Sequence, residues 1–169
     1  MPLEAIQMSS CPSRTTSRGR TRPFLCLRLP PDVTEVRNAV LAAEERLGQT
    51  DWPAQTLGLV ALVLAEALNN VVEHALAGRS AGRIDLSLYF TDARLHCRIR
   101  DDGAPMPEGA IPVTTRPDLT QETQDLPEGG FGWFLIRELA DEVAYTRRRG
   151  ENQLDILFDP ARLTDHMSD

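Results

Sequence analysis

The amino-acid sequence predicts an α+β protein, a two-layer α/β sandwich in which helices cover one face of a mixed, largely antiparallel sheet. Three observations lead to this fold class. Residues 57–68 are apolar on nearly every face, which is typical of a helix buried against a sheet. Residues 84–90 and 95–99 alternate apolar and polar side chains, which is typical of strands with one wet face. A second apolar-faced helix and two more strands follow a long loop.

The first three elements follow from the residues that bound each apolar run. An apolar run over 24–29 stops at two prolines, which predicts a short strand. A helix is expected to start at Asp32 or Thr34, whose side chains can cap its first turn, and to end at Leu47 before a glycine. The buried helix is expected next, over residues 51–77, with a proline in its first turn.

The later elements are separated by turn residues and by one long loop. They are expected in this order: a hairpin over 84–99, a proline-rich loop over 103–128, an apolar-faced helix ending near Asp141, and strands at 142–148 and 153–158 that turn at 150–152. A loop of that length inside a compact domain is typical of an active-site lid or a disordered segment.

The length of 169 residues has room for one ordinary domain, which we expect over 23–160. Residues 1–22 are rich in Ser, Arg, Thr and Pro and have little apolar surface to bury, so they are expected to form a disordered tail. Residues 161–169 are expected to form a polar C-terminal tail.

Composition excludes several function classes. The formal net charge of -7 leaves no general surplus of basic surface for a phosphate backbone, so no direct nucleic-acid partner is expected. All 18 basic residues are arginines, and without lysine the chain cannot form a Walker A loop. The longest apolar run is far shorter than the roughly 20 residues that cross a bilayer, and no secretory signal is visible, so we expect a cytoplasmic protein without a membrane partner.

Three polar residues share one face near the end of the buried helix. Glu66, Asn70 and His74 are successive i, i+4 neighbours. The amide oxygen of Asn70 suits Mg²⁺, and Glu66 could accept a proton from an attacking hydroxyl, which is a pairing for phosphoryl transfer. The alternative is a solvated helix end, in which His74 interacts with the helix dipole.

A second candidate lies where the hairpin meets the long loop. Asp101 begins an Asp-Asp-Gly sequence that ends at Gly103. The carboxylate of Asp101 could accept a hydrogen bond from the adenine amino group. The alternative is a simple turn, because Asp-Gly pairs commonly form turns.

The third candidate is a glycine-rich segment that opens the next helix. Gly129, Gly130 and Gly132 surround Phe131. Backbone N–H groups without flanking side chains can approach a phosphate, and a helix N-terminus favours negative charge. The alternative is a glycine hinge between the loop and the helix.

The order of these three segments resembles the Bergerat ATP-binding fold of the histidine-kinase-like (GHKL) ATPases. Residues 66–74 are similar to the N box of that superfamily, and residues 101–103 and 129–132 are similar to its two glycine boxes. The strings 66–74 and 129–137 most resemble those of the anti-sigma-factor serine kinases. The resemblance covers about 24–158, and Pro105 departs from it where a second glycine is usual.

The resemblance implies a protein serine/threonine kinase that uses ATP and Mg²⁺. In it Glu66 would be the catalytic base and Asn70 would hold Mg²⁺. Nucleotide contacts are expected from Asn70, His74, Asp101, Gly103, Gly129, Gly130, Phe131 and Gly132.

The resemblance also implies partner switching in transcription regulation. The expected partners are a sigma factor and a small STAS-type anti-anti-sigma protein, which the kinase would phosphorylate on serine; a homodimer is possible. One alternative is an ATP-binding partner-switch module without significant kinase turnover. A detached histidine-kinase domain ranks last, because no helical hairpin with a phospho-accepting histidine precedes the domain.

Overall fold

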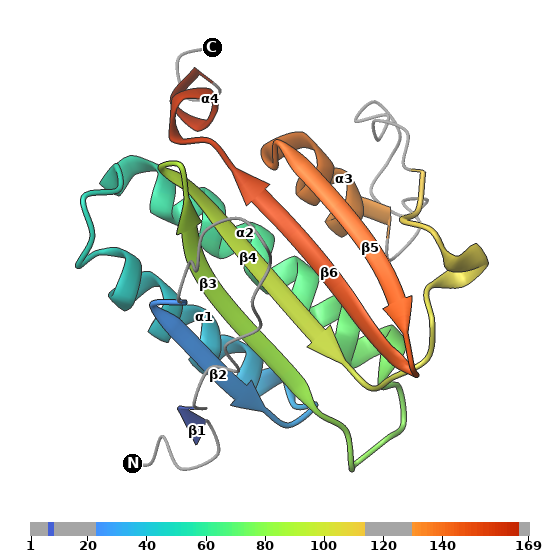
Figure 1. Cartoon of the computed structure of the whole chain (residues 1–169). Helices are drawn as coiled ribbons and strands as arrows, with labels where there is room; N and C mark the ends of the chain where they lie inside the picture. The colour runs from blue at the N-terminus through green and yellow to red at the C-terminus, as the bar shows by residue number, and fades with distance from the viewer. Residues whose placement is uncertain (1–6, 9–22, 114–129, 166–169) are drawn as a thin grey trace, which may run out of the picture.

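The computed structural model describes residues 7–8, 23–113 and 130–165. These residues form two layers, a sheet and a set of helices (Figure 1). Helices α1, α2 and α3 lie on the same side of the sheet, and its other side carries no helix among the described residues. The predicted α+β two-layer fold is therefore confirmed.

The sheet has six strands in the order β1-β2-β3-β4-β6-β5. Their bounds are Gln7–Met8 for β1, Leu25–Leu29 for β2, Ile84–Thr91 for β3, Arg94–Asp101 for β4, Glu142–Arg148 for β5 and Glu151–Phe158 for β6. Every pair among these strands is antiparallel. The largely antiparallel character is as predicted, whereas the described strands contain no parallel pair that a mixed sheet would need.

Alternation along each strand gives the sheet one dry and one wet face. In β3, Ile84, Leu86 and Leu88 are fully buried, while the residues between them are only partly buried. Cross-strand register keeps the apolar side chains together, since Leu86 pairs with Ile99 of β4. The core thus lies between the dry face and the helices.

Helix α1 (Val33–Leu47) begins at the capping residue Asp32. The Oδ1 atom of Asp32 accepts hydrogen bonds from the backbone N–H groups of Thr34, at 2.7 Å, and Glu35, at 3.4 Å. Of the two predicted caps, the structure therefore uses Asp32, because its carboxylate satisfies two N–H groups that the helix leaves unpaired.

Helix α2 (Ala54–Asn70) packs across the middle of the sheet. Together with the turn that follows it, the segment Ala54–Ala75 is long and apolar enough, with a mean hydropathy of 1.5, to match a membrane-crossing helix by length and composition. Val63, Leu64 and Leu68 are fully buried in the protein core. Burial against the sheet accounts for the apolar character of this helix.

The helix predicted over residues 51–77 ends as an α-helix at Asn70, earlier than predicted. After α2 the chain continues as a π-helical turn, η1 (Val71–Ala75), in which the N–H group of Leu76 donates to the carbonyl of Val71 at 2.8 Å. The wider turn changes which carbonyl groups are free at the helix end. Turns of this kind are frequent at functional sites.

The last hairpin turns earlier than predicted. Strand β6 begins at Glu151, and the two turn residues are Arg149 and Gly150, both with positive φ. Two-residue hairpin turns of this handedness need positive φ at both positions, which matches the right-handed twist of the strands. The predicted turn at 150–152 is therefore wrong by one to two residues.

Both predicted tails contain ordered elements. Strand β1 pairs with β2, and this pairing covers the edge that β2 would otherwise expose. At the other end, α4 (Pro160–Asp165) replaces part of the polar tail, because its Leu163 is fully buried and Asp159 accepts a hydrogen bond from its first turn. Residues 1–6, 9–22 and 166–169 of the predicted tails lie outside the described residues.

The predicted long loop is described as far as Val113 and includes a short 3-10 turn, η2 (Pro107–Gly109). Its remainder, residues 114–129, lies outside the described residues. Helix α3 (Gly130–Leu139) follows, close to the predicted bounds.

Candidate functional site

A cavity of about 440 Å³ lies between the end of α2, the loop after β4 and the inner face of β5 and β6. Its lining residues are Ala67, Asn70, Val71, His74, Ala75, Asp101, Ala104, Pro105, Met106, Pro107, Pro112, Trp133, Tyr145, Asn152 and Leu154. The wall is mostly apolar, with a few converging polar groups, as is usual for pockets that bind small organic ligands. Three sequence-predicted residues, Asn70, His74 and Asp101, meet in this cavity.

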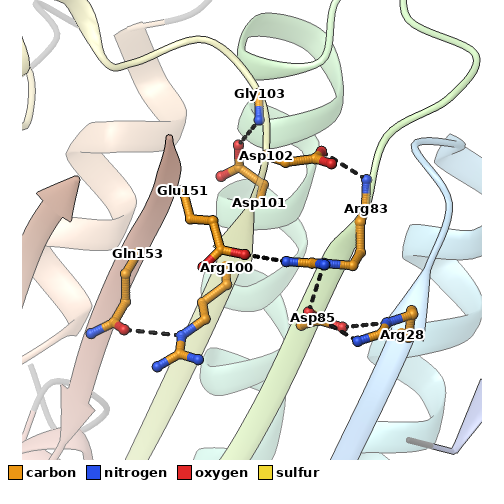
Figure 2. A network of polar contacts seen from close by, with 9 residues as sticks. All are labelled: Arg28, Arg83, Asp85, Arg100, Asp101, Asp102, Gly103, Glu151 and Gln153. Atoms are coloured by element: carbon orange, nitrogen blue, oxygen red, sulfur yellow. Dashed lines mark hydrogen bonds and ion pairs between the residues drawn. The ribbon is translucent and has the colours of Figure 1, made fainter. Parts of the chain in front are cut away.

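Asp101 ends strand β4 with its side chain on the dry face of the sheet, where the residue is 4% exposed. Its Oδ1 accepts the N–H of Gly103 at 2.8 Å (Figure 2) and the amide of Asn152 at 2.7 Å. Burial raises the pKa of Asp101, and these two hydrogen bonds oppose that rise. Oδ2 has no hydrogen-bond partner in the described part of the chain, so it can accept one from a ligand.

Asn152 is the polar hub behind Asp101. Besides Asp101, its Nδ2 donates to the carbonyl of Ala104 at 2.8 Å, and its Oδ1 accepts from the hydroxyl of Tyr145 at 2.7 Å and from Arg147. The residue is 4% exposed, and its amide oxygen and nitrogen are both satisfied. This hub fixes which oxygen of Asp101 is left for a ligand.

Sequence reasoning missed Asn152, which it placed in a turn. One signal could have found it, because the buried residues of β6 recur at every second position: Asn152, Leu154, Ile156 and Phe158. A polar residue on that inward face has to be satisfied inside the protein. Tyr145 was placed correctly in the predicted strand 142–148 but was not named as a site residue; its hydroxyl also accepts the N–H of Met106 at 3.1 Å.

The loop after Asp101 is hydrogen-bonded to the π-helical turn. The carbonyl of Ala75 accepts the N–H of Ala104 at 2.7 Å. A Cβ atom at Gly103 would lie 2.3 Å from that carbonyl oxygen and 2.8 Å from Oδ1 of Asp101. Only glycine therefore allows the predicted adenine-contacting segment to approach the end of the N-box helix this closely.

Gly103→Ala is expected to destabilise the protein by about 1–3 kcal/mol, because the new methyl group overlaps rigid backbone. Gly58→Ala provides a matched control. A Cβ atom there meets nothing within 4 Å inside helix α2, so this change should stabilise the fold by about 0.5–1 kcal/mol. Urea denaturation of both variants measures the difference, and equal stabilities would contradict the proposed packing.

Asn70 lines the cavity with a side-chain amide that the fold leaves unused. Its Nδ2 is buried and has no hydrogen-bond partner among the described residues. A half-turn of the amide exchanges its oxygen and nitrogen, so the same side chain can present a donor or a metal ligand. The described residues contain no group of three His, Cys, Asp or Glu side chains able to hold a metal. Mg²⁺ bound here would therefore need further oxygen ligands from phosphates.

Glu66 lies beside the start of α3 and outside the cavity lining. A Cβ atom at Gly132 would lie 2.5 Å from Oε2 of Glu66 and 3.7 Å from Nδ2 of Asn70. Because position 132 is a glycine, α3 and α2 can lie close to each other at the carboxylate of Glu66. Glu66 and Asn70 thus stand next to the glycine-rich segment, on the same side of α2.

The glycine-rich segment is only partly described. Gly130 is the first residue of α3, and Gly129 lies outside the described residues. Phe131 is 50% exposed, contacts Phe134 and does not line the cavity. The N-terminus of α3 is thus close to Glu66 and Asn70 and is suited to an anion.

Comparisons with known proteins bear on this arrangement. A family described as the histidine kinase-like ATPase domain matches residues 29–158. The serine/threonine-protein kinase BtrW of Bordetella bronchiseptica is 30% identical over 131 residues, 77% of this chain and 89% of that protein. The serine-protein kinase RsbW of Halalkalibacterium halodurans is 34% identical over 109 residues, 64% of each chain. The histidine kinase domain of an Erythrobacter litoralis blue-light activated histidine kinase has the same fold, with a TM-score of 0.50, 19% identity, and coverage of 89% of this chain and 72% of that chain.

Proposed function

The chain belongs to the histidine kinase-like ATPase family, within its anti-sigma-factor serine kinases, and on that premise we propose that it transfers phosphate from ATP to a serine of a small protein partner. The observation that carries this proposal is the cavity in which, among the described residues, the buried carboxylate of Asp101 has one oxygen without a hydrogen-bond partner and the amide of Asn70 has its nitrogen without one. Transfer of radiolabelled phosphate from ATP to a purified partner protein tests it.

The adenine base would occupy the apolar part of the cavity. Asp101 Oδ2 would accept a hydrogen bond from the exocyclic amino group, and the hub at Asn152 holds the carboxylate in place. Apolar wall residues such as Met106 and Leu154 would pack against the ring. A carboxylate facing an apolar slot favours a base that carries an amino group over one that carries a carbonyl at that position.

The phosphates would lie toward Asn70 and the N-terminus of α3. Asn70 would contribute one oxygen ligand to Mg²⁺, which when bound neutralises charge on the phosphates. His74 is exposed at the cavity and, with Gly130 and Gly132, would lie near the nucleotide. Glycine at position 132 lets the start of α3 come close to the carboxylate of Glu66.

Mg²⁺ binding is expected to depend on the nucleotide, because Asn70 alone cannot hold the ion. Calorimetry with Mg²⁺ alone should show no binding, and Mg²⁺ should tighten ATP binding in the parent protein. Asn70→Ala should remove most of that gain, about tenfold in Kd. Asn69→Ala, a neighbour that does not line the cavity, is the control. Retention of the full Mg²⁺ gain by Asn70→Ala would refute the assignment.

The proposed transfer step uses Glu66 as the base. The serine Oγ forms a bond to the γ-phosphorus, the bond from that phosphorus to the β,γ-bridging oxygen breaks, and ADP leaves. The hydroxyl proton passes to the carboxylate of Glu66. Positioning and electrostatics supply most of the catalysis in such a step, so the residues around Glu66 act mainly by holding it.

The partners would be a sigma factor and an anti-anti-sigma protein, with the chain working in the cytoplasm and able to pair as a homodimer. A second candidate is an ATP-dependent binding module without significant turnover. The position of Glu66 outside the cavity lining favours this candidate. ATP-dependent capture of the partner without phosphate transfer would support the module over the kinase.

A further inference from the structure

The wet face of the sheet carries a groove of about 640 Å³ at the end of the β5–β6 hairpin. Apart from Asn152, whose side chain faces the other cavity, its described lining residues are Arg100, Thr146, Arg148, Arg149, Glu151 and Gln153. By register these strand residues point away from the helices, so the groove lies on the face opposite the ATP cavity. No described helix covers it (Figure 1).

The acidic side chain among the described lining residues, Glu151, is already paired. Figure 2 shows a chain of ion pairs across three strands, in which Arg28 and Arg83 share Asp85 at 2.7 and 3.0 Å and Arg83 also bonds Glu151. This row of ion pairs contains two arginines and two carboxylates, so its charges balance. Glu151 therefore has its charge offset by Arg83 and is not free to offset the arginines of the groove.

The remaining arginines of the groove have no charged partner among the described residues. Arg100 donates to the neutral amide oxygen of Gln153 at 3.0 Å (Figure 2). Arg148 and Arg149 are exposed and form no ion pair with any residue the structure describes. Three arginines without a charged partner in the described part of the chain thus lie at one groove of a protein whose net charge is -7.

Arg149 occupies a position that suits another residue type. Its φ is 54° and that of Gly150 is 84°. Asn-Gly is the favoured pair in such a turn, because a side chain such as that of arginine is strained at positive φ. Arginine is therefore not the residue type that the turn itself favours at position 149.

We propose that this groove binds an acidic segment of a protein partner. Arginine guanidinium groups bind carboxylates through paired N–H donors, and Thr146 and Gln153 offer neutral hydrogen bonds between them. None of the described lining residues is aromatic, so they offer no ring on which a base could stack, and the net charge of -7 opposes a nucleic-acid backbone. The proposal does not depend on phosphate transfer, since the groove lies on the opposite face from the ATP cavity.

The test measures binding of a fluorescent oligoglutamate peptide to the full chain at low salt, with oligoglutamine as the neutral probe. Oligoglutamate should bind the parent and weaken as salt rises. The double variant Arg148→Gln/Arg149→Asn should weaken that binding by about tenfold. The control Arg37→Gln/Arg137→Gln removes the same charge from exposed positions on α1 and α3 and should leave the Kd near the parental value.

Equal losses in the two double variants would overturn the proposal, because net charge alone would then explain binding. A single-stranded RNA of equal charge that binds more tightly than oligoglutamate, and loses affinity in the same groove variant, would also overturn it. Arg149→Asn alone should keep or raise the thermal midpoint, because asparagine tolerates positive φ. This single variant separates loss of binding from loss of folding.

Discussion

Asp101→Asn is expected to weaken ATP binding by about 10²-fold or more, because it places an N–H donor where the adenine amino group needs an acceptor. The asparagine oxygen can still accept from Gly103 and Asn152, so the internal hydrogen bonds at this position are kept. Only the atom that faces the ligand changes, from the acceptor oxygen Oδ2 to an N–H donor. Calorimetric titration with ATP measures the effect.

Asp102→Asn is the matched control, since it removes the same charge from the next residue. Asp102 is exposed and accepts the backbone N–H of Arg83 at 3.0 Å (Figure 2), away from the cavity lining. It should leave the ATP affinity close to that of the parent. Parental affinity in Asp101→Asn would show that the adenine pocket lies elsewhere.

The raised pKa of Asp101 also predicts how stability and ATP affinity should depend on pH. Because burial raises this pKa above its ordinary value of 3.8, the folded state binds the proton more tightly than the unfolded state. At pH values above the ordinary pKa, the ionised carboxylate of Asp101 therefore lowers the stability of the folded state. Because Asp101→Asn removes this charge, it should keep or raise the stability at neutral pH. ATP affinity of the parent should fall with acid at a higher pH than an exposed aspartate would give.

The predicted fold agrees with the structure wherever a long periodic pattern was available. The apolar helix α2 and the alternating strands β3 and β4 are set mainly by burial, which side-chain periodicity reports directly. The short elements β1 and α4 carry too few residues for a period. They form through tertiary contacts, such as the pairing of β1 with β2 and the burial of Leu163.

The sequence segments that form the site could be predicted, whereas the hydrogen bonds that hold their side chains in place could not. Two short motifs located Asn70, His74 and Asp101, which the structure brings into one cavity. The hub at Asn152 depends on cross-strand register, in which Asp101 pairs with Asn152 from a hairpin far along the chain. The π-helical turn that frees the carbonyl of Ala75 also depends on packing, so no local pattern indicates it.

The register explains how the Asp101 side of the cavity is held together. Asn152 connects Asp101 to the loop at Ala104 and to Tyr145 on the neighbouring strand, while Arg147 donates to the carbonyl of Gly103 at 3.0 Å. Two strands and one loop thus hold a single carboxylate. On the opposite side, Asn70 and Glu66 lie close to Gly132 of α3, and this helix follows a segment outside the described structure.

Glu66→Gln is expected to keep ATP binding and to slow phosphate transfer by about 10²- to 10⁴-fold, which is the usual contribution of a general base. Glutamine preserves the shape of the side chain beside Gly132, so the approach of α3 to α2 is unchanged. The lost property is the ability to take the serine proton. Single-turnover transfer of radiolabel from ATP to the partner separates this step from binding.

Glu73→Gln is the control, because Glu73 is exposed on the following turn and does not line the cavity. Its transfer rate should match that of the parent. If Glu66→Gln transferred phosphate at the parental rate, another group would have to accept the proton and the base assignment would fall. If the parent itself bound its partner only with ATP and transferred no phosphate, the position of Glu66 outside the cavity lining would have a functional meaning: the site would act by ordering a binding surface.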